Sequence, residues 1–115
     1  MFKEYKTIDL KDHCTRIGGR VSKVFTGRDR GETVRKESKI DELYRKEGEI
    51  TLIIPPGTFS ITPSFLEELF TNIVKEYGIE EFRKTVHIEP NGYNIEVPLE
   101  EALDRILQDK NALQK

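Results

Sequence analysis

A serine at the start of an amphipathic segment is the residue of this chain whose type and position most clearly suggest a chemical role. Ser64 stands between Pro63 and Phe65, at the point where a helical pattern begins. A hydroxyl at a helix N-terminus lies at the positive end of the helix dipole, beside main-chain N–H groups that have no partner within the helix. A phosphate bound to or attached at Ser64 would therefore be stabilised.

The residues around Ser64 allow two helix starts. If Thr62 is the N-cap and Pro63 the first helical residue, Ser64 occupies the second helical position. If Ser64 is itself the N-cap, Glu67 completes a capping box of the Ser-x-x-Glu type. Capping is a common use of serine at helix starts, so we expect a structural role for Ser64 ahead of a signalling role.

A basic loop is the second candidate site, and the sequence predicts it over residues 26–31. Arg28 and Arg30 lie between Gly27 and Gly31, and Arg35 follows. Guanidinium groups and the N-terminus of a following helix can together bind an anion. We expect Arg28 and Arg30 to be exposed and mobile until a partner binds. The alternative is that these arginines pair with acidic neighbours on the surface.

Residues that could perform catalysis or bind a metal are sparse. His13 and Cys14 are adjacent, so within a strand they cannot face each other as base and nucleophile. His87 and Glu89 are expected on one face of a strand, but the sequence offers no third metal ligand. The pair Glu67-Glu68 fits a solvated helix face better than acid–base chemistry. We therefore expect no enzymatic activity, no catalytic residue, no metal and no cofactor.

Two elements position these side chains. Glu49 to Pro55 is almost continuously apolar, which predicts a central strand covered on both faces. From Phe65 to Tyr77 apolar residues recur at the helical period, which predicts an amphipathic helix ended by Gly78. We expect this helix to pack on one face of the sheet.

Weaker patterns complete an α/β fold with a mixed sheet and packed helices. They predict strands at Tyr5–Leu10, Val21–Phe25 and Thr85–Glu89. They also predict a helix at Glu32–Lys46, a short connection at Glu80–Lys84, a turn at Pro90–Gly92 and a last helix opened by Pro98. We expect one domain over residues 1–115, with an N-terminal strand and turn (1–20), a core (20–107) and a tail (108–115) that frays from Lys110.

Length and composition exclude several classes of protein. The chain has 115 residues, which suits one domain, and 35% of them are charged. The 19 basic and 21 acidic residues give a net charge of −2, which argues against a dedicated nucleic-acid binder. However, residues 16–36 carry 7 basic and 2 acidic residues, so the rest of the chain is acidic. No apolar run is long enough to span a membrane, and a single cysteine fits a cytoplasmic protein.

The segment around Ser64 resembles the STAS-like domain family of unknown function, a relative of the STAS domains of anti-sigma factor antagonists. The residues that match the family pattern are Gly57, Ile61, Ser64, Phe65, Glu67, Glu68 and Leu69. Upstream, Gly27-Arg28, Gly31 and Val34-Arg35 are similar to the family's approach to its first helix. Ile54-Pro55 replaces an Asp-Phe pair, and Phe65 stands where classical STAS domains have the glycine after their phosphorylated serine.

This resemblance implies a regulatory domain that binds another protein and is switched by phosphate at Ser64. It also implies a partner such as a histidine-kinase-type ATPase. Phe65, Glu67 and Glu68 would bind the partner, and Ser64 or Thr62 would accept the phosphate or cap the helix. The alternative is a small-ligand module that binds a phosphate or nucleotide through the Gly27–Gly31 loop, with Arg28, Arg30 and Arg35 as anion ligands.

Overall fold

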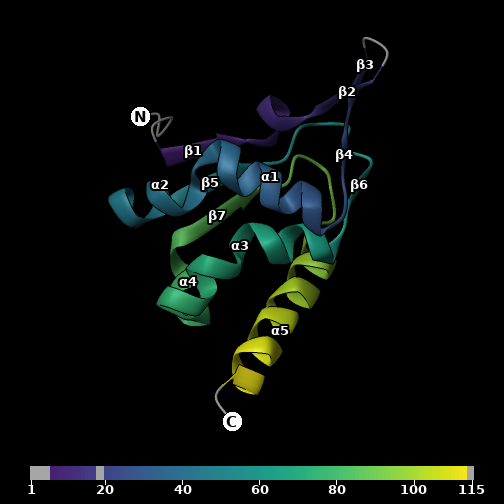
Figure 1. Ribbon diagram of the computed structural model, residues 1–115. Coiled ribbons are helices and arrows are strands. Elements are labelled where there is room, and N and C mark those ends of the chain that lie inside the picture. The colour runs from purple at the N-terminus through teal and green to yellow at the C-terminus, as the bar shows by residue number, and fades with distance from the viewer. Residues whose placement is uncertain (1–5, 18–19, 114–115) are drawn as a thin grey trace.

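The chain forms an α/β domain (Figure 1), and the computed structural model describes residues 6–17 and 20–113, with the side chains of residues 6–14 and 23–109. Within these residues the main sheet has three parallel strands in the order β1 (Thr7–Asp9), β5 (Ile50–Ile53), β7 (Val86–Glu89). An antiparallel hairpin of β2 (Thr15–Ile17) and β3 (Arg20–Ser22) projects from the body. Strands β4 (Val24–Phe25) and β6 (Ser60–Ile61) pair in parallel. The α/β class and the central position of the Ile50 strand are confirmed.

Helices provide the second layer of the domain. They are α1 (Arg28–Ser38), α2 (Ile40–Glu47), α3 (Pro63–Tyr77), α4 (Ile79–Thr85) and α5 (Glu96–Leu113), and a 3-10 turn, η2 (Leu10–His13), follows β1. None of the helices in the described part of the chain combines the length and apolar character that crossing a membrane requires.

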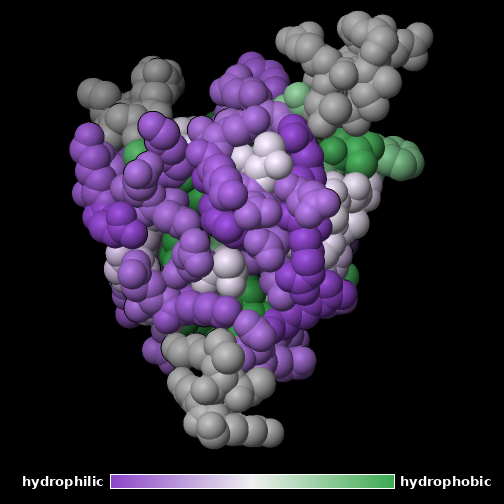
Figure 2. Space-filling model, viewed as in Figure 1, coloured by the Kyte–Doolittle hydropathy of each residue, from purple (hydrophilic) through white to green (hydrophobic). Residues whose placement is uncertain are grey.

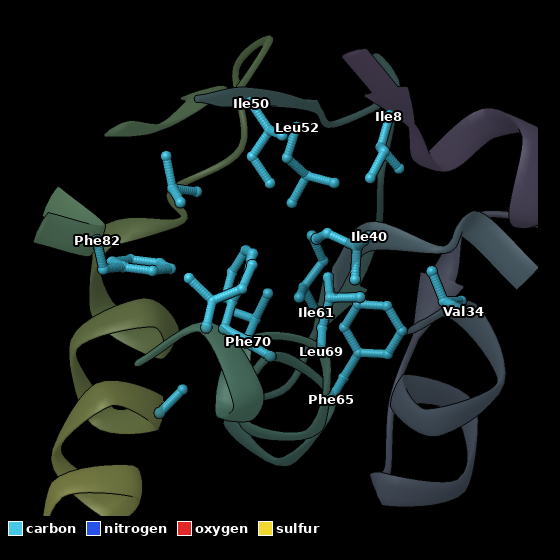
Figure 3. Close-up of a cluster of buried hydrophobic side chains, with 14 of the residues drawn as sticks. Ile8, Val34, Ile40, Ile50, Leu52, Ile61, Phe65, Leu69, Phe70 and Phe82 are labelled. Atoms are coloured by element: carbon cyan, nitrogen blue, oxygen red, sulfur yellow. The ribbon is translucent and has the colours of Figure 1, made fainter. Parts of the chain in front are cut away.

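Helix α3 is the centre of the core, and it confirms the predicted amphipathic helix. Its apolar side is fully or almost fully buried through Phe65, Leu66, Leu69, Phe70 and Ile73. Figure 3 shows Phe65, Leu69 and Phe70 of this helix facing Ile8, Ile50 and Leu52, which point towards the helices from the sheet. Helices α1 and α5 pack against α3 from either side.

Among the described residues, helices cover the main sheet on one face only, which corrects the expectation for the central strand. In β5 the buried Ile50 and Leu52 alternate with the half-exposed Thr51 and Ile53. In β7 Val86 is buried, whereas His87 and Glu89 are exposed. The apolar run at residues 50–54 therefore reflects strand propensity on the open face as well as burial on the other.

Several predicted boundaries are wrong. The predicted helix Glu32–Lys46 is two helices, because Lys39 adopts a left-handed conformation with φ of 55° between α1 and α2. The expected connection Glu80–Lys84 is part of α4. Residues Val21–Phe25 divide between β3 and β4 rather than forming one strand.

The ends of the chain also differ from the prediction. The first strand, β1, is shorter than predicted, and Tyr5 lies outside the described residues. Helix α5 begins at Glu96, two residues before Pro98, and continues beyond Lys110 to Leu113. The last two residues of the expected frayed tail lie outside the described chain.

Candidate functional site at two adjacent helix starts

The parallel strands β4 and β6 bring two helix starts together. Strand β4 leads into α1 and strand β6 leads into α3, so both helices begin at the same end of this strand pair. The pairing continues past the strands, because the main-chain N–H of Thr62 donates to the carbonyl of Phe25 at 3.1 Å. Gly27 and Thr62, the N-cap residues of the two helices, are therefore neighbours.

Thr62 is the residue that joins the two helix starts. Its Oγ1 accepts a hydrogen bond from the Gly27 N–H at 3.0 Å and one from the Phe65 N–H at 3.4 Å. Gly27 makes this approach with φ of 88°, a conformation that favours glycine. One hydroxyl thus accepts a main-chain N–H from each helix start.

Ser64 occupies the second helical position, as in the first of the two predicted helix starts. The expectation that Ser64 caps α3 is wrong, because the cap hydrogen bond goes to Thr62. The half-buried Ser64 places its hydroxyl 3.2 Å from Thr62 Oγ1, and Glu67 binds arginines instead of completing a capping box. The hydroxyl of Ser64 is therefore a second polar group at a helix end that is already capped.

Residues 28–31 belong to α1, which corrects the prediction of a basic loop. Gly31 is buried where α1 crosses α3, and a Cβ there would lie 2.5 Å from the carbonyl oxygen of Phe65. Arg30 is half-buried, and its guanidinium donates to the carbonyl of His13. The expectation of an exposed and mobile Arg30 is therefore wrong.

The remaining arginines form what we call the ion-pair seam, made of Arg28, Arg35, Glu67 and Glu68. Arg28 Nη2 lies 3.1 and 3.2 Å from the two carboxylate oxygens of Glu67, and its Nη1 lies 3.3 Å from Glu68 Oε2. Arg35 Nη1 donates to Glu68 Oε1 at 2.9 Å and to the Glu68 carbonyl at 2.6 Å. Both candidate sites of the sequence meet here, because the arginines of one pair with the glutamates of the other.

The predicted contact residues differ in what they offer to a partner. Phe65 is completely buried and Glu67 is 8% exposed, so both belong to the interior. By contrast, Phe59, which the sequence pattern did not single out, is 83% exposed just before β6. Its N–H donates to the Lys23 carbonyl at 2.9 Å, which fixes its backbone beside β4.

A second residue that sequence reasoning missed is Tyr93, whose hydroxyl binds the main chain of β6 just before the start of α3. Its hydroxyl accepts a hydrogen bond from the Ile61 N–H at 2.8 Å and lies 3.3 Å from the Ile61 carbonyl. This pairing acts in place of a neighbouring strand for β6. A tyrosine 32 residues away in the chain gives no local signal for such a role.

Catalytic geometry is not evident among the described residues. Each histidine pairs with a glutamate: His13 Nδ1 lies 3.2 Å from Glu37, and His87 Nε2 lies 2.6 Å from Glu49. Among residues with described side chains, no three His, Cys, Asp or Glu gather as metal ligands.

Comparisons with protein-family models, with curated proteins and with solved structures give no match to this chain.

Proposed function

We propose that this chain is a non-enzymatic regulatory domain that binds another protein through the surface around the start of α3, and that a phosphate on Ser64 controls the binding. The observation that carries the proposal is that the hydroxyl of Thr62, and not that of Ser64, caps α3. Thr62 caps the helix, so Ser64 can be modified without loss of the cap.

The surroundings of Ser64 explain how a phosphate would change this surface. Glu67 and Glu68 follow Ser64 by three and four residues, so they share its side of α3. A phosphate adds about 1.5 to 2 negative charges, which the helix N-terminus stabilises and the two carboxylates oppose. The phosphate would compete with these carboxylates for Arg28, whose side chain is 57% exposed. Phosphorylation would thus rearrange the exposed end of the ion-pair seam.

Phe59 supplies an apolar contact for a partner. Large exposed aromatic side chains are frequent anchors of protein interfaces. Phe59 lies three residues before Thr62, and the parallel pairing with β4 holds its main chain. The resemblance to STAS domains suggests a histidine-kinase-type ATPase as the class of partner.

The alternative function, a phosphate or nucleotide module, receives less support. Arg28 and Arg35 have carboxylate partners, and Arg30 has a carbonyl partner. An anion would have to displace these groups before it could bind. No observation on the described residues favours that exchange without a covalently attached phosphate.

Quantitative affinity capture tests the proposed function. The tagged protein and its variants Ser64→Ala, Ser64→Asp and Phe59→Ala are used as bait in an extract of the source cells, with Glu80→Ala as a control on the exposed surface of α4. We expect one protein to be recovered by the native bait, by Ser64→Ala and by Glu80→Ala, and lost with Ser64→Asp and Phe59→Ala. Recovery of the same proteins by all five baits would contradict the proposal.

A further inference from the structure

The edge of the main sheet at β7 is an open strand edge. Strand β5 pairs with β7 on one side, and no described strand pairs on the other. The Ile54 N–H donates to the Glu89 carbonyl at 2.9 Å, so the main-chain groups of Glu89 and His87 face β5. Those of Val86 and Ile88 consequently face outward.

The outward groups differ in what they can still bind. The Val86 N–H is already used, because it donates to the Phe82 carbonyl at the end of α4. Ile88 retains both its N–H and its carbonyl, and no hydrogen bond to either is found among the described residues on the outer side. One residue with a free donor and a free acceptor is what an antiparallel pair across a two-fold axis requires.

We propose that two copies of this chain associate through antiparallel pairing of their β7 edges, centred on Ile88. In this register each Ile88 N–H donates to the Ile88 carbonyl of the other copy. His87 of each copy, whose Nε2 lies 2.6 Å from Glu49, would also lie opposite Glu89 of the other copy on the open face of the sheet, so that each imidazole gains a second carboxylate neighbour. The two three-stranded sheets become one continuous sheet.

Neighbouring residues exclude the other registers. A pairing centred on His87 would set Glu89 against Thr85, which is still helical in α4. A pairing centred on Val86 would need the Val86 N–H that Phe82 occupies. In the proposed register Val86 faces Pro90, where neither residue has a free N–H to leave unsatisfied.

The side chains beneath the edge also favour a second copy. Ile88 is half-exposed, and it lines a groove of about 680 Å³ with Phe82, Val86, Tyr93, Ile95 and Leu99. Ile88 side chains of two copies would cover each other, and the two grooves would meet. β7 is a short edge strand, and within its four residues it has no proline, no bulge and no inward charge that would block pairing.

Disulfide trapping tests the register directly. In a Cys14→Ser background, single-cysteine variants His87→Cys and Glu89→Cys are mildly oxidised separately and as an equimolar mixture. Opposed residues of a non-hydrogen-bonded antiparallel pair have Cα atoms about 4.5 Å apart, which a disulfide can bridge. We expect a covalent dimer in the mixture and little in either variant alone. Equal yields in all three samples, or no dimer in the mixture, would overturn the proposal.

Sedimentation equilibrium of the native chain provides the second measurement. We expect a concentration-dependent monomer–dimer equilibrium that Glu89→Lys shifts at least fivefold towards monomer, because the lysine would face His87. Lys46→Glu, an exposed change on α2, should leave it unchanged. A strictly monomeric native chain would also overturn the proposal, and would leave the groove to a partner of another kind.

Discussion

The start of α3 carries a pair of hydroxyl residues and a pair of glutamates. Only one hydroxyl has a structural role, whereas both glutamates form ion pairs. Thr62 is the N-cap and Ser64 is the second helical residue, so the hydroxyl of Thr62 is required for the cap and that of Ser64 is not. Glu67 and Glu68 both form ion pairs with arginines of α1. Whether a polar side chain is available for modification or binding therefore depends on whether a neighbouring residue already makes the hydrogen bonds or ion pairs required at that position.

The surface of the molecule shows a contrast of its own, in hydropathy. Figure 2 shows a largely hydrophilic face on which the most prominent apolar area projects at the upper right, in the region of β4 and β6. We expect substitutions of the residues that the fold requires to lower the stability more than substitution of Ser64 does.

The largest effect is expected at the crossing of α1 and α3. Gly31→Ala places a methyl group 2.5 Å from the Phe65 carbonyl and 2.8 Å from Glu68 Cβ, so the helices must move apart. We expect a loss of about 1–3 kcal/mol in the free energy of unfolding, measured by urea titration. Gly92→Ala, at a turn with open space around its Cα, is a control for backbone strain alone. An unchanged stability of Gly31→Ala would contradict the close crossing and the ion-pair seam that depends on it.

The cap should come next. Thr62→Ala removes the acceptor of two main-chain N–H groups, and we expect a cost of about 0.5–2 kcal/mol by the same titration. Thr62→Ser retains the hydroxyl and should recover most of the stability. If Thr62→Ala were neutral, Ser64 would be able to replace the cap and would not be a spare group.

Arg28 tests whether the ion-pair seam is structural. Arg28→Ala leaves the nearly buried Glu67 with one basic partner among the described residues, Arg105, which lies 3.8 Å away. We expect a loss of about 0.5–1.5 kcal/mol, reduced by the exposure of the Arg28 side chain. Lys84→Ala, at an exposed position, should change stability by less than about 0.5 kcal/mol. Equal results for the two variants would mean that Arg28 is available to bind an anion.

A smaller effect is expected from an exposed ion pair far from the seam. Arg83 lies 2.7 and 2.8 Å from the carboxylate oxygens of Glu100, and this hydrogen-bonded pair holds the pKa of Glu100 below its ordinary value of 4.5. Because the folded-state pKa is lowered, the pair stabilises the protein above pH 4.5 and the contribution is lost as the pH falls through that lowered pKa.

The variant Glu100→Gln measures this contribution. We expect it to be about 0.2–1 kcal/mol less stable than the native protein at pH 7, with the difference vanishing in strong acid. Thermal unfolding at a series of pH values gives the comparison. A difference that persists unchanged in strong acid would assign the effect to packing instead of charge.

The sequence predicted those parts of the fold in which apolar residues follow one clear pattern, either a helical repeat over several turns or a continuous run along a strand. The apolar repeat from Phe65 to Tyr77 and the run at residues 50–53 each correspond to an observed element. The break at Lys39 was not predictable, since a lysine in the left-handed conformation carries no glycine signal. Helix α4 was missed because its seven residues bury only Phe82.

The helix start at the candidate site was predicted from the sequence, whereas the contacts that surround it were not. The sequence indicated a helix start with hydroxyls at residues 62–64, and the structure places a helix start there. The pairing of Arg28 with Glu67 joins residues 39 positions apart, and the Gly27–Thr62 contact joins residues 35 apart. Such contacts depend on the pairing of β4 with β6, two strands of two residues each that have almost no sequence signature.

The most direct test of the account combines stability and binding for Ser64 alone. Ser64→Ala and Ser64→Asp are compared with the native chain by urea titration and by capture of the partner. We predict free energies of unfolding within about 0.5 kcal/mol of the native value for both variants, with binding kept by Ser64→Ala and lost by Ser64→Asp. A loss of stability in Ser64→Ala as large as that of Thr62→Ala, or binding unchanged in both variants, would contradict the assignment of Ser64 as the spare, regulatory hydroxyl.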